Sequence, residues 1–304
     1  MSTRRAFLGS GISLATVASL GAFTSRAEAA KARIGTSIIA PGITLLDGAG
    51  CNVVAVHGTE GSLLVDGGYA ANARALLKAA SQATRNERVA TLINTHWHPA
   101  QTGANEIVGK AGAQIIAHEV TRLYLGRAVG SVDYDGLYGP LPAAARPVKT
   151  TRATGSLSFD GRQVDYGYLP AAHTSGDLYV HLPEANLLVT GGPVCSESWP
   201  MLDYRNGAWL GGLVKAHEKL ASLVKPDTRV VPANGRVLTG AELQQQHALF
   251  AAFHEQMVVF QNKGMDSGDC IAAKPLKAFE AQYGDASRFI YGAFQSLNLA
   301  YSPD

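Results

Sequence analysis

Two histidines stand two residues apart, at His96 and His98, directly after an apolar run from Val89 to Ile93 that is typical of a buried strand. In extended chain, residues i and i+2 point to the same side, so both imidazoles can face one ion while Trp97 faces away. Imidazole nitrogen is a preferred ligand of Zn²⁺. Pro99 keeps His98 out of the helical region and can open the helix that follows. The pattern predicts a metal-binding turn at the carboxyl end of a strand.

The stretch from Asn94 to Asn105 resembles the signature turn of the metallo-β-lactamase superfamily, which reads Thr-His-x-His-x-Asp-His. Other segments resemble further parts of that family's pattern. They are Leu64-Val65-Asp66-Gly67, Pro170 to Asp177 around His173, Leu188 to Gly192, and Val231 to Gly235. The resemblance covers nearly the whole chain after its first thirty residues and implies the fold of a metal-dependent hydrolase.

Carried over position by position, the resemblance implies that all ligands exclusive to the first metal ion are kept. These are His96, His98 and His173. The positions of the second metal site hold other residues instead of an Asp, a His, a bridging Asp and a final His. They are Ala100, Gln101, Gly192 and Asn234. The resemblance therefore implies a degenerate second site and one retained zinc ion.

Three histidines and one water molecule complete a catalytic zinc site, in which the ion lowers the pKa of the water to about 7. We expect Asp66 and Thr95 to orient the histidines. No side chain is a certain general base, because Ala100 lacks the carboxylate, and Gln101 and Asn234 cannot take up a proton at neutral pH. Four aromatic residues are candidates for a pocket over the ion: Trp97, Tyr134, Tyr138 and Trp199.

These features predict a hydrolase of a small ester, lactone, amide or thioester that uses a single zinc ion. The missing second-metal ligands argue against the phosphodiesterase branches, which the resemblance associates with two ions. Two alternatives stay open. One is a catalytically inactive member of the family whose pocket binds a ligand or a partner protein. The other is a single-metal site used for isomerisation or elimination.

The segments that must position these residues are strands and helices in alternation. Three strand-like runs come first, Ile38 to Leu46, Cys51 to His57 and Ser62 to Asp66. Hairpins are expected within residues 157–168 and 177–190. Helices are expected at residues 72–83, 209–223 and 239–262. Residues 129–149, which are rich in Gly, Pro and Ala, are expected to form a long loop. Strands followed by helices, twice over, predict an α/β (α+β) protein. With the resemblance, this implies a four-layer αββα sandwich of the metallo-β-lactamase type.

We expect residues 30–265 to form this domain and residues 266–304 to form a helical C-terminal extension packed on it. Residues 1–29 are a predicted signal peptide. Ser2-Thr3-Arg4-Arg5-Ala6-Phe7-Leu8 resembles a twin-arginine export motif, and Ala27-Glu28-Ala29 is a small-x-small cleavage site. Gly, Ser and Thr dilute the apolar run between them, which favours a cleaved signal over a membrane anchor. The predicted location is periplasmic or secreted, with no stable membrane span in the mature chain.

The charge of the chain is close to balanced. Its formal net charge is +2, and Arg4, Arg5, Arg26 and Glu28 lie in the predicted signal, so the remainder is near zero. This balance does not favour nucleic acid or an anionic membrane as a partner, and we expect a small-molecule substrate or ligand. The oligomeric state stays open. The three cysteines, Cys51, Cys195 and Cys270, form no regular framework; one disulfide is compatible with the sequence, but buried thiols are favoured.

Overall fold

A computed structural model describes residues 33–301 of the chain. The described residues belong to one compact unit. The twin-arginine motif and the predicted cleavage site lie outside the described residues. No helix among residues 33–301 is both long enough and apolar enough to cross a membrane.

The first sheet combines a meander with a parallel half. Its seven strands lie in the order β1 (Gly35–Ala40), β2 (Ile43–Asp47), β3 (Val53–Val56), β4 (Ser62–Val65), β5 (Val89–Ile93), β6 (Gln114–His118) and β7 (Lys149–Thr151). Strands β1 to β4 pair antiparallel, and β4 to β7 pair parallel. The prediction of one strand from Ile38 to Leu46 is wrong. Pro41 and Gly42 form a turn there, because Gly42 readily adopts its φ of 70°.

The second sheet carries the two predicted hairpins. Its six strands lie in the order β13 (Leu238–Thr239), β12 (Arg229–Asn234), β11 (Leu187–Cys195), β10 (Asp177–Leu182), β9 (Arg162–Leu169) and β8 (Thr154–Phe159). β8 pairs antiparallel with β9, and β10 with β11, so both hairpins are confirmed. Asp160 and Gly161 both have positive φ, as a tight two-residue hairpin turn requires.

The two sheets pack face to face, and the core between them is built from inward β-branched and leucine side chains. The first sheet contributes Val54, Val65 and Ile93, and the second contributes Val164, Val180 and Val231. Burial of both faces explains why Val53–Val56 of β3, residues 63–65 of β4 and residues 187–189 of β11 are continuous apolar runs rather than alternating ones. This core brings the loops at the ends of β5, β9 and β11 close together.

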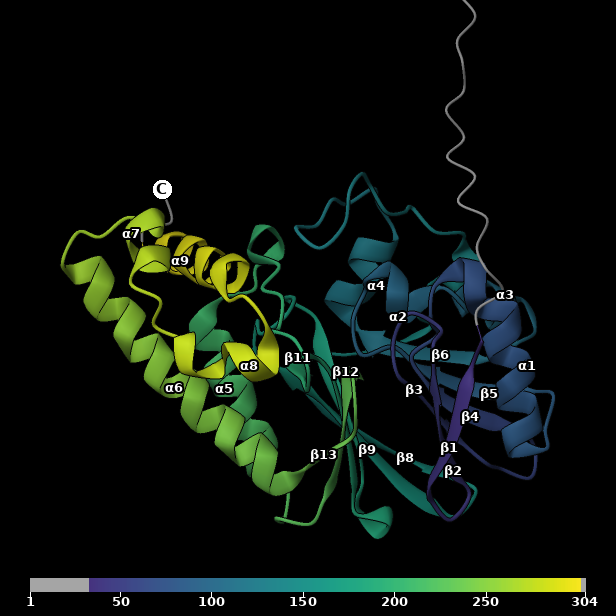
Figure 1. The fold of residues 1–304 in the computed structure, drawn as a ribbon. Coiled ribbons are helices and arrows are strands. Elements are labelled where there is room, and N and C mark those ends of the chain that lie inside the picture. Colours follow the sequence, from purple (N-terminus) through teal and green to yellow (C-terminus); the bar gives the residue numbers. More distant parts are fainter. Residues whose placement is uncertain (1–32, 302–304) are drawn as a thin grey trace, which may run out of the picture. The chain divides into compact units, whose positions relative to one another are not determined.

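Helices cover the outer face of each sheet (Figure 1). α1 (Ala73–Thr84) and α3 (Asn105–Lys110) pack on the first sheet, with α2 (Pro99–Thr102) and α4 (Glu119–Leu125) in its connections. The second sheet is covered by α5 (Leu210–Ala221), α6 (Gly240–Asn262), α7 (Ser267–Ala272), α8 (Glu280–Tyr283) and α9 (Ser287–Tyr301). Short 3-10 turns complete the chain: η1 (Ala70–Asn72), η2 (Ala143–Ala145), η3 (Pro183–Ala185), η4 (Tyr204–Asn206) and η5 (Lys277–Phe279). The predicted αββα sandwich is confirmed.

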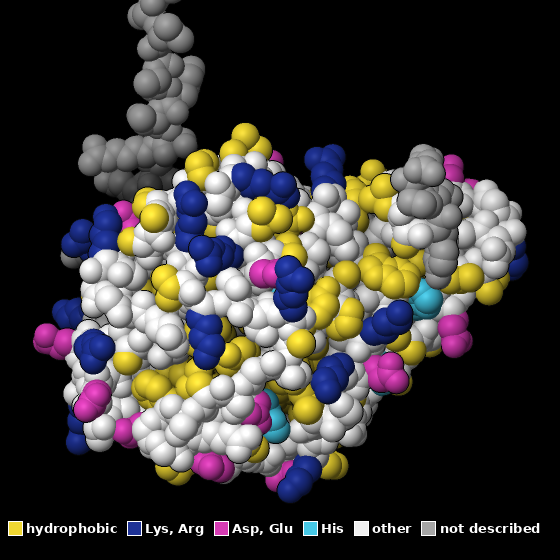
Figure 2. Space-filling view, turned by 180° about the vertical axis from the view of Figure 1, so that it is seen from behind, with side chains coloured by type: hydrophobic (Ala, Val, Ile, Leu, Met, Phe, Trp, Pro, Cys, Tyr) yellow, Lys and Arg dark blue, Asp and Glu magenta, His cyan; other side chains and the backbone are white. Residues whose placement is uncertain are grey.

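The C-terminal helices share one apolar core with α5 and α6. Cys270 of α7 and Phe289, Ile290 and Leu297 of α9 are buried in the same cluster as Phe250 of α6. All three cysteines are free and buried, as the composition favoured. On the face in Figure 2, basic side chains are spread out, with acidic and hydrophobic side chains between them.

Candidate metal centre

Two loops bring His96, His98 and His173 to one place. His96 and His98 follow β5, and His173 lies between β9 and β10. One nitrogen of each ring lies within 4.8 Å of the others, and all three side chains are buried. The structure thus brings together the three histidines that the sequence assigned to a metal ion.

Asp66, at the end of β4, fixes the turn that carries His96. Its carboxylate accepts hydrogen bonds from the Thr95 backbone N–H and from Thr95 Oγ1, both at 2.8 Å. Burial raises the pKa of Asp66 to about 7, although the two hydrogen bonds from Thr95 act to lower it. Asp66 also has a φ of 67°, which non-glycine residues adopt mainly where the surrounding structure imposes it. Its carboxylate is held by Thr95, and its backbone N–H donates to the Ile93 carbonyl at 2.9 Å.

The Asp66–Thr95 pair sets the tautomer of His96. Because the Thr95 hydroxyl hydrogen is directed to Asp66, Thr95 Oγ1 accepts from His96 Nδ1, at 3.0 Å. The lone pair of His96 is then on Nε2. Burial, and after it the neighbouring His173 and His98, hold the pKa of His96 well below its usual value. His96 is therefore neutral, as a metal ligand must be.

His173 is fixed by a carbonyl on one side. Its Nδ1 donates to the Met201 carbonyl at 2.7 Å, which leaves the lone pair on Nε2 because a carbonyl can only accept. Burial, and then the nearby His98, lower the pKa of this imidazole. Asp177 accepts from the backbone N–H groups of His173 and Thr174, at 2.7 and 2.8 Å, and so stabilises the turn.

His98 is fixed by a carboxylate. Its Nε2 donates to Asp203 Oδ2 at 3.1 Å, so that in a neutral ring the lone pair is on Nδ1. The indole of Trp97 packs edge-on against the His98 ring, with 4.7 Å between the ring centroids. The ring of Trp97 thus packs against His98, and the carboxylate of Asp203 orients it.

These three tautomers fit a divalent cation. His98 Nδ1 and His173 Nε2 face each other at 3.1 Å, and in the neutral rings both atoms carry lone pairs. Two lone pairs at this distance repel unless a proton or a cation lies between them. Three neutral imidazoles converging on one point are the donor set of a catalytic zinc site. The three histidines could therefore hold a metal ion.

The four second-metal positions offer no carboxylate. Ala100 packs on the apolar cluster beneath the first sheet, Gln101 is buried with Oε1 unpartnered, and Asn234 is exposed at the end of β12. At Gly192 a Cβ would lie 2.1 Å from Cδ2 of His173. Since the His173 ring occupies that space, an aspartate cannot be accommodated at Gly192 unless the third histidine moves.

Two carboxylates near the histidines were not predicted from the sequence. Asp203 is buried in the loop after β11 and accepts from Ser131 Oγ at 2.9 Å and from Asn206 Nδ2 at 2.8 Å. Burial alone would raise the pKa of Asp203, but the bond from His98 and these partners hold it below its usual value. Asp133 Oδ2 lies 3.6 Å from His98 Nδ1. Neither belongs to a spaced motif, so no sequence pattern indicated them.

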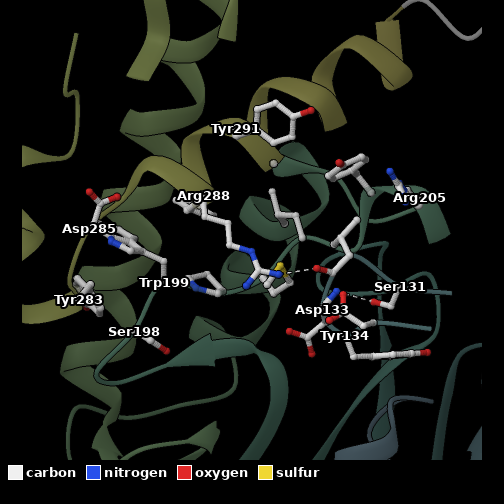
Figure 3. A pocket seen from close by; sticks show the side chains of 18 residues that line it. Ser131, Asp133, Tyr134, Ser198, Trp199, Arg205, Tyr283, Asp285, Arg288 and Tyr291 are labelled. Carbon is white, nitrogen blue, oxygen red and sulfur yellow. Dashed lines mark hydrogen bonds between the residues drawn. The ribbon is translucent and has the colours of Figure 1, made fainter. Parts of the chain in front are cut away.

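A cavity of about 720 Å³ opens beside the histidines. Its wall includes Ser131, Asp133, Tyr134, Trp199 and Arg288, several of which are labelled in Figure 3. The three histidines do not line the cavity themselves. Two residues of the cavity wall contact His98. Asp133 Oδ2 lies 3.6 Å from His98 Nδ1, and the ring centroid of Tyr134 is 5.9 Å from that of His98.

Only two of the four aromatic residues expected around the ion line this cavity. Tyr134 and Trp199 do so. Trp97 does not, because its side chain is fully buried against Leu125 and Val129. Tyr138 does not either, and its hydroxyl pairs with Thr102 Oγ1 at 2.7 Å. The Trp97 ring therefore packs against His98 instead of forming the pocket.

Comparisons with known proteins agree with this fold. A metallo-β-lactamase from Pontibacter korlensis superposes with a TM-score of 0.58 at 19% identity, over 72% of this chain and 99% of that one. The DIM-1 metallo-β-lactamase gives 0.57 at 18% identity, over 72% and 98%. The inverting sec-alkylsulfatase Pisa1 from Pseudomonas sp. gives 0.63 at 17% identity, over 86% of this chain and 50% of that one. A search of curated proteins gave no match.

The sequence also matches a family model, and the match covers most of the chain. The model of the metallo-β-lactamase superfamily matches residues 46–236. That range runs from β2 to the residues after β12 and contains all three histidines. Because the match spans more than half of the chain, the protein belongs to the metallo-β-lactamase superfamily.

Proposed function

We propose that this protein is a hydrolase of a small ester, lactone, amide or thioester, and that it uses one zinc ion held by His96, His98 and His173. The main support is the convergence of three imidazole nitrogens beside a cavity of about 720 Å³. A cavity of that size suits a small molecule. The superfamily match and the likeness to hydrolase structures agree with this proposal.

A zinc ion bound there would polarise a carbonyl oxygen and activate water at neutral pH. The residues around it hold the three ligands in place. Thr95, Asp203 and the Met201 carbonyl each receive the N–H of one imidazole and so leave the other nitrogen unprotonated. Trp97 packs against the His98 ring, and Tyr124 packs against Trp97 with 5.1 Å between their ring centroids.

The rival function is binding without catalysis. One observation favours it: the segment after His98 supplies no carboxylate, since Ala100 is apolar and Gln101 is buried. In that case the cavity would receive a ligand or a partner that is not turned over.

The test is the metal content of the purified full chain, compared with that of His98→Ala and of His247→Ala as a matched control on α6. We expect about one equivalent of zinc in the wild type and the control, and none in His98→Ala. A chelator should abolish hydrolysis of chromogenic esters, lactones or β-lactams, and added zinc should restore it.

Each outcome separates the candidates. Zinc without turnover of any of these substrates favours the binding protein. A wild-type chain that takes up no divalent metal rules out the proposed hydrolase. Equal metal content in His98→Ala and the wild type would place the ion elsewhere.

Export by the twin-arginine route is part of the proposal and is tested separately. Arg4→Lys together with Arg5→Lys should retain the protein in the cytoplasm, whereas Arg26→Lys should leave export unchanged. Mass spectrometry of the exported protein should give an N-terminus at Ala30. Export of the double variant at the wild-type level would contradict the twin-arginine route.

A further inference from the structure

A carboxylate from a distant loop lies close to one of the three histidines. Asp133 lies between α4 and β7, 35 residues after His98 in the chain. Its Oδ2 atom is 3.6 Å from His98 Nδ1, the nitrogen that also faces His173. The side chain of Asp133 is 40% exposed, and it lines the cavity. It thus lies beside His98 and forms part of the cavity wall.

The backbone around Asp133 is held from two sides. On the inner side, Asp203 accepts hydrogen bonds from Ser131 Oγ at 2.9 Å and from the Val132 N–H at 3.4 Å. Ser131 Oγ also accepts a hydrogen bond from the Asp133 N–H, at 3.1 Å. On the outer side, Arg288 of α9 crosses the cavity and donates to the Val132 carbonyl (Figure 3). The position of Asp133 therefore depends on the same Asp203 that orients His98.

When His98 is neutral, the contact between Asp133 and His98 brings together two hydrogen-bond acceptors, the carboxylate oxygen and the imidazole Nδ1. His98 Nε2 donates to Asp203, so Nδ1 presents its lone pair to the Asp133 carboxylate. A carboxylate oxygen and an imine nitrogen repel each other, and a cation between them turns the repulsion into attraction. Three neutral imidazoles also leave the full charge of a divalent ion uncompensated. A nearby carboxylate lowers that charge and strengthens binding.

We propose that Asp133 is a metal-binding residue of this site and supplies from the loop the carboxylate that Ala100 lacks. The inference rests on the proposed function, because it requires that the three histidines bind a metal. Asp133 contributes the negative charge at the cavity side of the ion, and His96, His98 and His173 contribute the buried side. Three histidines and Asp133 would fill a tetrahedral zinc site, so a substrate or water would bind by expansion to five ligands.

The matched variants are Asp133→Asn and Asp135→Asn. Asp135 is an exposed carboxylate two residues further along the same loop, and it also lines the cavity. Zn²⁺ affinity is measured on the full chain by competition with a chromophoric chelator, and Co²⁺ binding is followed by its visible absorption spectrum. We expect Asp133→Asn to weaken Zn²⁺ binding roughly tenfold or more and to change the Co²⁺ bands. Asp135→Asn should stay within about twofold of the wild type.

The control separates a direct contact from a general charge effect. If both variants weaken binding equally, and salt reduces the loss, Asp133 acts only through long-range charge and the inference is overturned. Unchanged affinity and an unchanged Co²⁺ spectrum in Asp133→Asn also overturn it, because the carboxylate then makes no contact with the metal. In both cases the zinc hydrolase still stands. Absence of metal from the wild type would overturn both proposals.

Folding of the variants can be checked directly. Because Asp133 is partly exposed and asparagine has the same shape, its thermal unfolding should match that of the wild type. Arg288→Ala is a second route to the same question, since it releases the loop from α9 without touching Asp133. It should weaken Zn²⁺ binding by a smaller factor than Asp133→Asn. If Arg288→Ala weakens binding and Asp133→Asn does not, another residue of the loop binds the metal.

Discussion

His98 Nε2 donates to Asp203 Oδ2 across 3.1 Å, and the two side chains are almost fully buried. Asp203→Asn should weaken Zn²⁺ affinity roughly 10- to 100-fold, because an amide is a poorer acceptor for the imidazole N–H and the loop of Ser131 loses its charged anchor. Chelator competition measures the change. Asp285→Asn is the control, since Asp285 also lines the cavity but caps the start of α9. Equal affinities in both variants would contradict a role of Asp203 in orienting His98.

Gly192→Ala should reduce metal binding by displacing His173. The added Cβ would lie 2.1 Å from the imidazole Cδ2 atom, well inside van der Waals contact. Gly292→Ala on α9 is the control, because its Cβ would lie 3.9 Å from the nearest atom. We expect Gly192→Ala to lose most of its zinc, by metal analysis, and Gly292→Ala to keep it. Retention of zinc by both variants would mean that β11 can shift to make room.

His217 should make stability depend on pH. Burial lowers the pKa of His217 to about 4 from an unfolded value near 6.5, so the unfolded chain takes up a proton first. The stability that this neutral histidine contributes is complete above pH 6.5 and is lost as the pH falls towards 4, by up to about 3 kcal/mol. His217→Leu should flatten the curve of unfolding free energy between these values, measured in urea. His247→Leu should keep the wild-type slope, and an unchanged slope in His217→Leu would contradict the assignment.

Trp199 should affect substrate binding more than turnover. It stacks on Phe289 at 5.4 Å between ring centroids, and its Nε1 donates to the Gly284 carbonyl, so its ring forms a fixed part of the cavity wall. Trp199→Leu should raise KM roughly three- to tenfold and leave kcat nearly unchanged. Val259→Leu, on an exposed position of α6, should change neither. A fall in kcat at constant KM would instead place Trp199 next to the reacting atoms.

The local parts of the site could be predicted from the sequence. The pairing of His96 with His98 follows from two-residue periodicity after an apolar strand, and both features are contained in ten residues. His173 needed the family resemblance, because it lies 75 residues beyond His98. The turn at Pro41 and Gly42 was missed because apolar residues continue on both sides of it, so the hydrophobic pattern did not mark the break.

The carboxylates could not be predicted in the same way. Asp133 and Asp203 lie in loops whose course is set by contacts between residues far apart in the chain, such as Arg288 with Val132, 156 positions apart. No periodicity records such a contact. Gly192 is a similar case: the sequence indicates a missing aspartate, but only the structure indicates that the third histidine fills the space.

The family match ends at residue 236, yet Arg288 and Tyr283 of the C-terminal helices form part of the cavity wall. The ligands that would hold the metal and much of the surface that would meet the substrate are therefore encoded in separate stretches of the chain. We therefore expect a substitution at Tyr283 to change substrate preference while the histidine segments stay as they are.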